Sequence, residues 1–118
     1  MHWTYIADRL ADDVVVIDVK GHMTLAEPES LLFAHVARLA RDGKRRHFVV
    51  NLRHLAFIDS VGIGEIVRSY THLASQGGTL ALAEVGPRVR DVLEVTHLDS
   101  IIRMFDSEEA AVRSFDGR

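Results

Sequence analysis

The chain has 118 residues, and 47% of them are apolar, which suits one domain with a core of its own. It contains no cysteine, which excludes disulfides, thiolate zinc sites, iron–sulfur clusters and a cysteine nucleophile. The formal charge of −3 argues against nonspecific nucleic-acid binding, which depends on a large basic surface.

No apolar run in the sequence approaches the roughly 20 residues that a membrane-spanning helix needs. The first residues, Met1–Tyr5, do not form a charged region followed by an apolar one, so we expect no signal peptide. We therefore expect a cytoplasmic protein in which residues 1–118 form a single domain without membrane insertion.

The N-terminal part of the chain predicts two strands. Trp3–Ile6 is aromatic and β-branched, and Val14–Val19 is a stronger apolar run that ends near Gly21. Because the polar pair Asp12-Asp13 lies between them, we expect an antiparallel hairpin.

A helix is expected next, from about Leu25 to Arg41, and Gly43 ends it. Thr24 is a candidate N-cap, with Glu27 three residues on as in a capping box. The apolar stripe of this helix consists of Leu25, Leu32, Val36 and Leu39.

The middle of the chain predicts a buried strand at Phe48–Leu52 and a helix that runs from Ser60 to about Gln76, where Gly77-Gly78 ends it. Helical periodicity divides the helix into two faces. The face expected to point inward carries Ile63, Ile66, Val67, Tyr70, Leu73 and Ala74. The face expected to point outward carries Glu65, Arg68, Ser69, His72 and Ser75.

The last part of the chain predicts strands at Thr79–Ala83 and Ile101–Phe105, a short helix opened by Pro87, and a closing helix capped by Ser107. Strands that alternate with helices indicate an α/β fold with a mostly parallel central sheet, an N-terminal antiparallel hairpin and about four helices. Binding sites in such sheets favour the carboxyl ends of strands, and the loop before Ser60 lies at such an end.

Asp59-Ser60 directly precedes the strongest predicted helix. The ordinary interpretation is an N-cap, in which either side chain accepts a hydrogen bond from a free helical amide. A functional interpretation is compatible with it, because the positive end of a helix dipole favours a phosphate on Ser60. Such a phosphate adds about −1.5 to −2 charges and would act on a partner's surface more than on this fold.

Several catalytic and metal-binding motifs are incomplete. Gly62-Ile63-Gly64 lacks the third glycine of a dinucleotide loop, since Val67 stands there. Ile58 replaces the first glycine of a hydrolase nucleophile elbow around Ser60. The seven histidines do not form a metal-binding motif, so we expect no cofactor, no metal and no enzyme activity.

Lys44-Arg45-Arg46-His47 is a basic run after Gly43. Such a run is usually a solvated turn. Contact with an acidic partner or with a phospholipid headgroup is the alternative, and four residues do not decide between them.

The stretch from Phe57 to Gly64, which follows Asn51-Leu52, resembles the signature of STAS domains, in which an Asp-Ser pair and two glycines open a helix. The resemblance continues through Gly77-Gly78, through Val85–Glu94 and through Thr96–Asp99. It covers most of the chain from about Val14 onward, in the same order of elements.

The resemblance implies a function as an anti-sigma factor antagonist. In that branch of the family, the unphosphorylated protein binds an anti-sigma factor that is also a serine-protein kinase, and ATP belongs to this partner. The kinase phosphorylates the serine after the Asp, which is Ser60 here, and a phosphatase reverses the modification.

The resemblance also implies a partner-binding surface. Asp59, Val61, Gly62 and Gly64 would shape the loop and the helix start around the phosphoacceptor Ser60. Exposed Glu65, Arg68 and Ser69 would contact the partner, as would His22 and Thr24 in the stretch after the first core strand.

Two departures from the family pattern concern the partner. Val61 stands where a second Ser or Thr is common, and Gly21-His22-Met23-Thr24 lacks the usual Leu and Asp. The alternative function is an interaction subunit of another assembly, such as a lipid-transport ABC complex or a stressosome-like complex, without phosphorylation of Ser60. Formation of a homodimer stays open.

Overall fold

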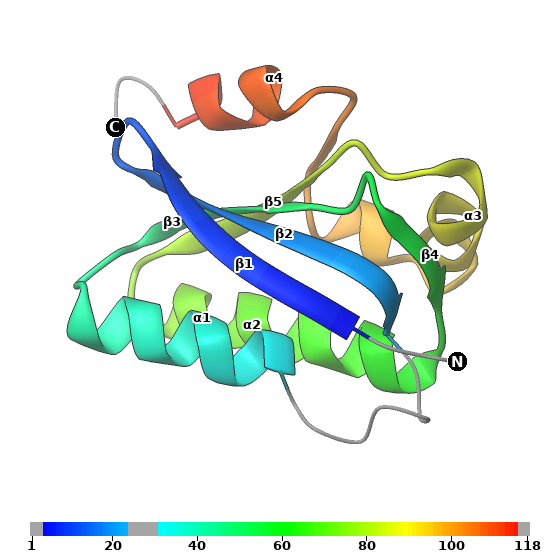
Figure 1. Ribbon diagram of the computed structural model, residues 1–118, viewed down its shortest axis with the longest axis horizontal. Helices are drawn as coiled ribbons and strands as arrows, with labels where there is room; N and C mark the ends of the chain where they lie inside the picture. Colours follow the sequence, from blue (N-terminus) through cyan, green and yellow to red (C-terminus); the bar gives the residue numbers. More distant parts are fainter. Residues whose placement is uncertain (1–3, 24–30, 116–118) are drawn as a thin grey trace.

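The computed structural model describes residues 4–23 and 31–115 of the chain. Within them, six strands and four α-helices form three layers (Figure 1). The strands are β1 (Thr4–Ala11), β2 (Val14–Met23), β3 (His47–Asn51), β4 (Leu55–Ile58), β5 (Thr79–Ala83) and β6 (Met104–Phe105). The helices are α1 (Leu31–Asp42), α2 (Ser60–Ser75), α3 (Pro87–Val95) and α4 (Glu108–Arg113), with a 3-10 turn at Leu98–Ser100.

The six strands form one sheet in the order β1-β2-β3-β5-β6, and β4 pairs with the end of β2. The β1–β2 hairpin is antiparallel, and all other pairs are parallel. The predicted α/β class, with a mostly parallel sheet and an N-terminal hairpin, is confirmed.

Strand β2 supplies side chains to two apolar cores. Val15, Ile17 and Val19 belong to the core under α1, α2 and α3, whereas Val14 and Val16 belong to the core under α4. This division follows from the alternation of side chains across a strand. Figure 1 shows the result, with α1 and α2 on one face of the sheet and α4 on the other.

A polar network joins the hairpin to α4. The Arg9 guanidinium lies 2.9 Å from an Asp18 carboxylate oxygen and donates to both carboxylate oxygens of Glu108. Asn51 Nδ2 also donates to Glu108, at 2.9 Å. The hydrogen bond from Arg9 holds the pKa of Glu108 below its ordinary value, against the opposing effect of burial. Arg9 of the edge strand β1 and Asn51 of β3 therefore fix α4 to the sheet through Glu108.

Two predictions of strands need correction. The four residues of β4 were not predicted as a strand, because so short an apolar run gives no periodic signal. The strand predicted at Ile101–Phe105 is shorter in the structure, where β6 consists of Met104–Phe105. Before it, His97 adopts a left-handed conformation at φ 63° and a 3-10 turn follows at Leu98–Ser100. The predicted capping box of Thr24 and Glu27 lies outside the described residues.

The buried face of α2 is rotated relative to the prediction. Ile66 and Leu73 are buried as expected, but Val67 and Ala74 are exposed. The reason is that α2 packs against α1 as well as against the sheet. Its buried face therefore consists of Gly62, Glu65, Ile66, Ser69 and Leu73.

Glycines fix both ends of α2. At the C-terminal end, Gly77 has φ 79° and donates its N–H to the Ala74 carbonyl, while Gly78 donates to the Leu73 carbonyl at 2.8 Å. At the N-terminal end, a Cβ on Gly62 would lie 2.4 Å from the Met23 carbonyl oxygen. The first turn of α2 thus packs directly against the backbone at the end of β2.

We predict that Gly62→Ala destabilises the protein by about 1–3 kcal/mol, because the added methyl group overlaps backbone atoms of β2. Urea denaturation measures this change. Gly64→Ala is the matched control, since nothing lies within 4 Å of a Cβ there and alanine favours a helix over glycine by about 0.5–1 kcal/mol. Equal effects of the two substitutions would contradict the close approach of α2 to β2.

Candidate functional site

Ser60 is the first residue of the 16-residue helix α2, and its side chain is exposed. Asp59, in extended conformation, is the N-cap. Its Oδ1 accepts hydrogen bonds from the amides of Val61 at 2.9 Å and Gly62 at 3.3 Å. Of the two candidate caps, Asp59 therefore fills the role, and Ser60 presents its hydroxyl to solvent beside the helix N-terminus.

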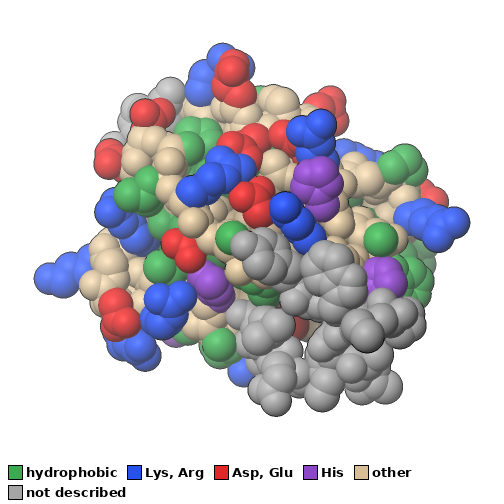
Figure 2. Space-filling model, in the orientation of Figure 1, with side chains coloured by type: hydrophobic (Ala, Val, Ile, Leu, Met, Phe, Trp, Pro, Cys, Tyr) green, Lys and Arg blue, Asp and Glu red, His purple; other side chains and the backbone are tan. Residues whose placement is uncertain are grey.

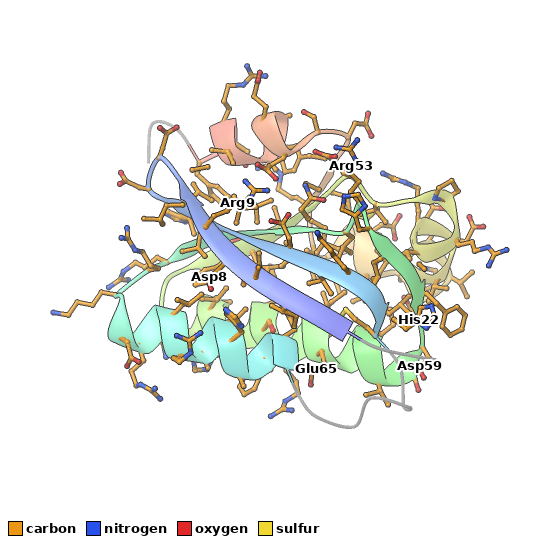
Figure 3. All side chains as sticks on the ribbon, viewed as in Figure 1. Asp8, Arg9, His22, Arg53, Asp59 and Glu65 are labelled. Carbon is orange, nitrogen blue, oxygen red and sulfur yellow. The ribbon has the colours of Figure 1, made fainter. Side chains whose placement is uncertain are left out.

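The end of β2 lies beside this helix start. The Asp59 amide donates to the Met23 carbonyl at 3.1 Å, and His22 is the register partner of Phe57 in β4. His22 therefore lies at the same end of the sheet as the Asp59-Ser60 loop, and Figure 3 shows His22 and Asp59 at the same end of the molecule. Thr24 lies outside the described residues.

Phe57 adds an aromatic surface to this end, which the sequence analysis did not predict. Its side chain is 48% exposed, and the His22 ring meets it edge-on with centroids 6.3 Å apart. The sequence offers no signal for this exposure, because so short an apolar run does not show which of its side chains are buried. Beyond β4 lies an apolar hollow lined by Leu55, Ala56, Gly86, Pro87, Arg88 and Val89.

Glu65 and Ser69 are buried, so the expectation that they are exposed interface residues is wrong. The Glu65 carboxylate accepts a hydrogen bond from the Phe33 amide, in the first turn of α1, at 3.1 Å. Ser69 Oγ donates to the Glu65 carbonyl at 2.8 Å within α2. Because α1 has no acidic residue in its own first turn, Glu65 supplies the negative charge that its N-terminus favours.

Arg68 remains at the surface of α2. Its guanidinium lies 4.2 Å from the centroid of the Phe33 ring, and its Nη1 is 3.6 Å from Glu65 Oε2. Val61 and Gly64 are partly exposed. Of the predicted partner-binding residues, those with surface near the helix start are therefore His22, Asp59, Ser60, Val61 and Gly64, whereas Arg68 is exposed about two turns further along α2.

The described part of the chain contains no group of three or more His, Asp or Glu side chains placed to hold a metal ion. Among the same residues, no helix has both the length and the apolar character required to cross a membrane.

Comparison with known proteins identifies the family. The sequence model of the STAS domain family matches residues 5–111, which is most of the chain. The chain belongs to the STAS domain family. The assignment made from the Asp59-Ser60 motif and its neighbours is thereby confirmed.

The relatives of this STAS domain include proteins named for one activity. An anti-sigma F factor antagonist of Paenibacillus polymyxa is 33% identical over 70 residues, which cover 59% of this chain and 60% of that protein. A candidate anti-sigma factor antagonist of Bordetella bronchiseptica, BtrV, is 32% identical over 88% of each chain. The solved structure of the anti-sigma factor antagonist SpoIIAA in its unphosphorylated form has the same fold, with a TM-score of 0.78 and 22% identity over 97% of this chain and 98% of that one.

We predict that Glu65→Ala destabilises the protein by about 1–2 kcal/mol, because the Phe33 amide loses its acceptor and the first turn of α1 loses its negative charge. Urea denaturation measures the loss, and amide hydrogen exchange of Phe33 locates it. Glu65→Gln is the control, since it keeps an oxygen acceptor and should protect the Phe33 amide better than alanine does. If both variants exchange at the wild-type rate, Glu65 does not cap α1.

Proposed function

We propose that this protein is an anti-sigma factor antagonist, a binding module switched by phosphorylation of Ser60. The observation that carries the proposal is the exposed Ser60 at the first position of α2, held there by the Asp59 cap. The relatives from Paenibacillus polymyxa and Bordetella bronchiseptica, named for this activity, support it. In this account residues 1–118 form one STAS domain that acts by binding in the cytoplasm, and not by catalysis.

The phosphate on Ser60 would act mainly on the partner. Asp59 Oδ1 already occupies the amides of Val61 and Gly62, so a phosphate does not gain these donors unless it displaces the cap. It would instead project outward and add about −1.5 to −2 charges next to a carboxylate. A partner surface that fits the neutral serine then meets a concentrated negative charge, while the helix itself keeps its cap.

The partner in this proposal is an anti-sigma factor that is also a serine-protein kinase and that binds ATP itself. It would contact Ser60 together with the exposed ring of Phe57, the partly buried His22 and the exposed Arg68. Phe57 gives this surface an apolar centre, as protein interfaces usually have. A phosphatase would restore the binding form.

We predict that Ser60→Asp weakens binding of this kinase partner by at least about tenfold, or ~1.4 kcal/mol, whereas Ser60→Ala keeps wild-type affinity. The partner is captured on the immobilised protein from its native cells, identified by mass spectrometry and titrated against each variant. Ser100→Asp, an exposed serine in the 3-10 turn after α3, is the control for added charge. If all variants bind the same ATPase with equal affinity, Ser60 does not control binding. The protein would then be a constitutive subunit of another assembly.

We predict that Phe57→Ala lowers the affinity for the same partner by about tenfold or more, as expected for an aromatic residue at the centre of an interface. The free energy of unfolding should change by less than about 1 kcal/mol, because half of the ring is already in solvent. Val95→Ala is the control, since Val95 is also exposed but lies at the far end of α3. If Phe57→Ala binds the partner with unchanged affinity, Phe57 of β4 is not part of the binding surface.

A further inference from the structure

A basic cluster lies at the end of α1 and in the turn before β3. It consists of Arg38, Arg41, Lys44, Arg45 and Arg46, with Asp42 as its one acidic residue. The stretch thus holds five of the chain's 14 Lys and Arg but one of its 17 Asp and Glu. It carries a net charge of +4, and the rest of the chain carries −7. So strong a separation of charge in a small protein calls for an explanation.

The fold accounts for two of the five cations. Arg46 Nη1 donates to the Gln76 carbonyl at the C-terminal end of α2, at 2.9 Å, and Arg41 Nε donates to Asp42 at 2.8 Å. Both lie at helix C-termini, where the dipole favours positive charge. Within residues 4–23 and 31–115, Arg38, Lys44 and Arg45 have no carboxylate at ion-pairing distance. The pKa of Asp42 is lowered by the hydrogen bond from Arg41 and also by the charge of Arg38. Lys44 and Arg45 are therefore the cations of the cluster for which the described residues show neither an ion pair nor an effect of this kind.

The cluster is concentrated on one end of the molecule. Lys44, Arg45 and Arg46 line a hollow together with Ala40 and Gln76. Figure 2 shows Lys and Arg side chains gathered at the end where α1 and α2 finish in Figure 1. Ser60 starts α2 and Gln76 follows its last residue, so a helix of about 24 Å separates the two surfaces. A partner at Ser60 leaves the cluster accessible.

We propose that this basic cluster is a second docking surface, which binds an acidic segment of a partner protein. Charge complementarity is the argument for the occupant. None of the large apolar side chains that are exposed in the described residues lies between 31 and 46, so the surface lacks an anchor for lipid. The net −7 of the remaining chain repels a long polyanion such as a nucleic acid, whereas a short acidic segment can be confined to the cluster.

The two surfaces give the protein two independent contacts. The Ser60 end would respond to phosphorylation, and the basic end would bind whatever the state of Ser60. Because exposed charges interact over about 8 Å at physiological salt, the cluster would mainly raise the rate of association and orient the partner. The inference therefore stands whether or not Ser60 is a phosphoacceptor.

The test is an NMR titration of the whole protein with a short peptide of alternating Glu and Gly residues, at about 0.15 M salt. We expect saturable shift changes confined to residues 38–46 and 76–78. Lys44→Glu/Arg45→Glu should weaken binding at least about tenfold, as expected when two contacting charges change sign. Arg88→Glu/Arg113→Glu changes the net charge equally, away from the cluster, and should bind nearly as wild type.

Three outcomes would overturn the proposal. The first is the absence of saturable changes in the wild-type protein, and the second is an equal loss of affinity in both double variants, which would reflect net charge alone. The third is binding to phosphatidylglycerol vesicles without binding to the peptide, which would assign the cluster to an anionic lipid surface.

Discussion

The contact between the first turn of α2 and the end of β2 is the constraint on which the site depends. The Asp59 amide binds the Met23 carbonyl, and Gly62 lets the helix approach the same carbonyl without a side chain between them. With the helix start held this way, the Asp59 carboxylate accepts hydrogen bonds from the amides of Val61 and Gly62, and Ser60 is exposed to solvent. The exposure of Ser60 is thus a consequence of backbone packing at the helix start.

Helix α2 connects the Ser60 end of the molecule to α1, to the main core and to the basic cluster. Through Glu65 it caps α1, through Ile66 and Leu73 it packs into the main core, and through the Gln76 carbonyl it binds Arg46 of the basic cluster. Its two ends therefore differ, with an exposed serine at the N-terminus, where the helix dipole favours negative charge, and several cations at the C-terminus, where it favours positive charge. A rigid element of this kind can hold two partner surfaces at a fixed separation.

The sequence predicts this fold well where local rules dominate and less well where tertiary packing does. The cap before Ser60, the glycine end at Gly77 and strand β5 follow from turn chemistry and apolar periodicity, and all are present. The sequence analysis placed Glu65 and Ser69 on the outer face because an amphipathic pattern assigns polar residues to solvent. In the structure, the Phe33 amide of α1 instead donates a hydrogen bond to the Glu65 carboxylate. The exposure of Phe57 escaped prediction because it depends on what β4 packs against and not on its own sequence.

The most direct test of the central claim is phosphopeptide mass spectrometry of this protein, isolated from its native cells during growth and during stress. The account predicts a phosphate on Ser60 whose occupancy differs between the two conditions, because the exposed serine beside the Asp59 cap is the switch. A Ser60 that is unmodified in every condition, or a phosphate found on another serine instead, would contradict it. The protein would then be a constitutive binding module on the same STAS fold.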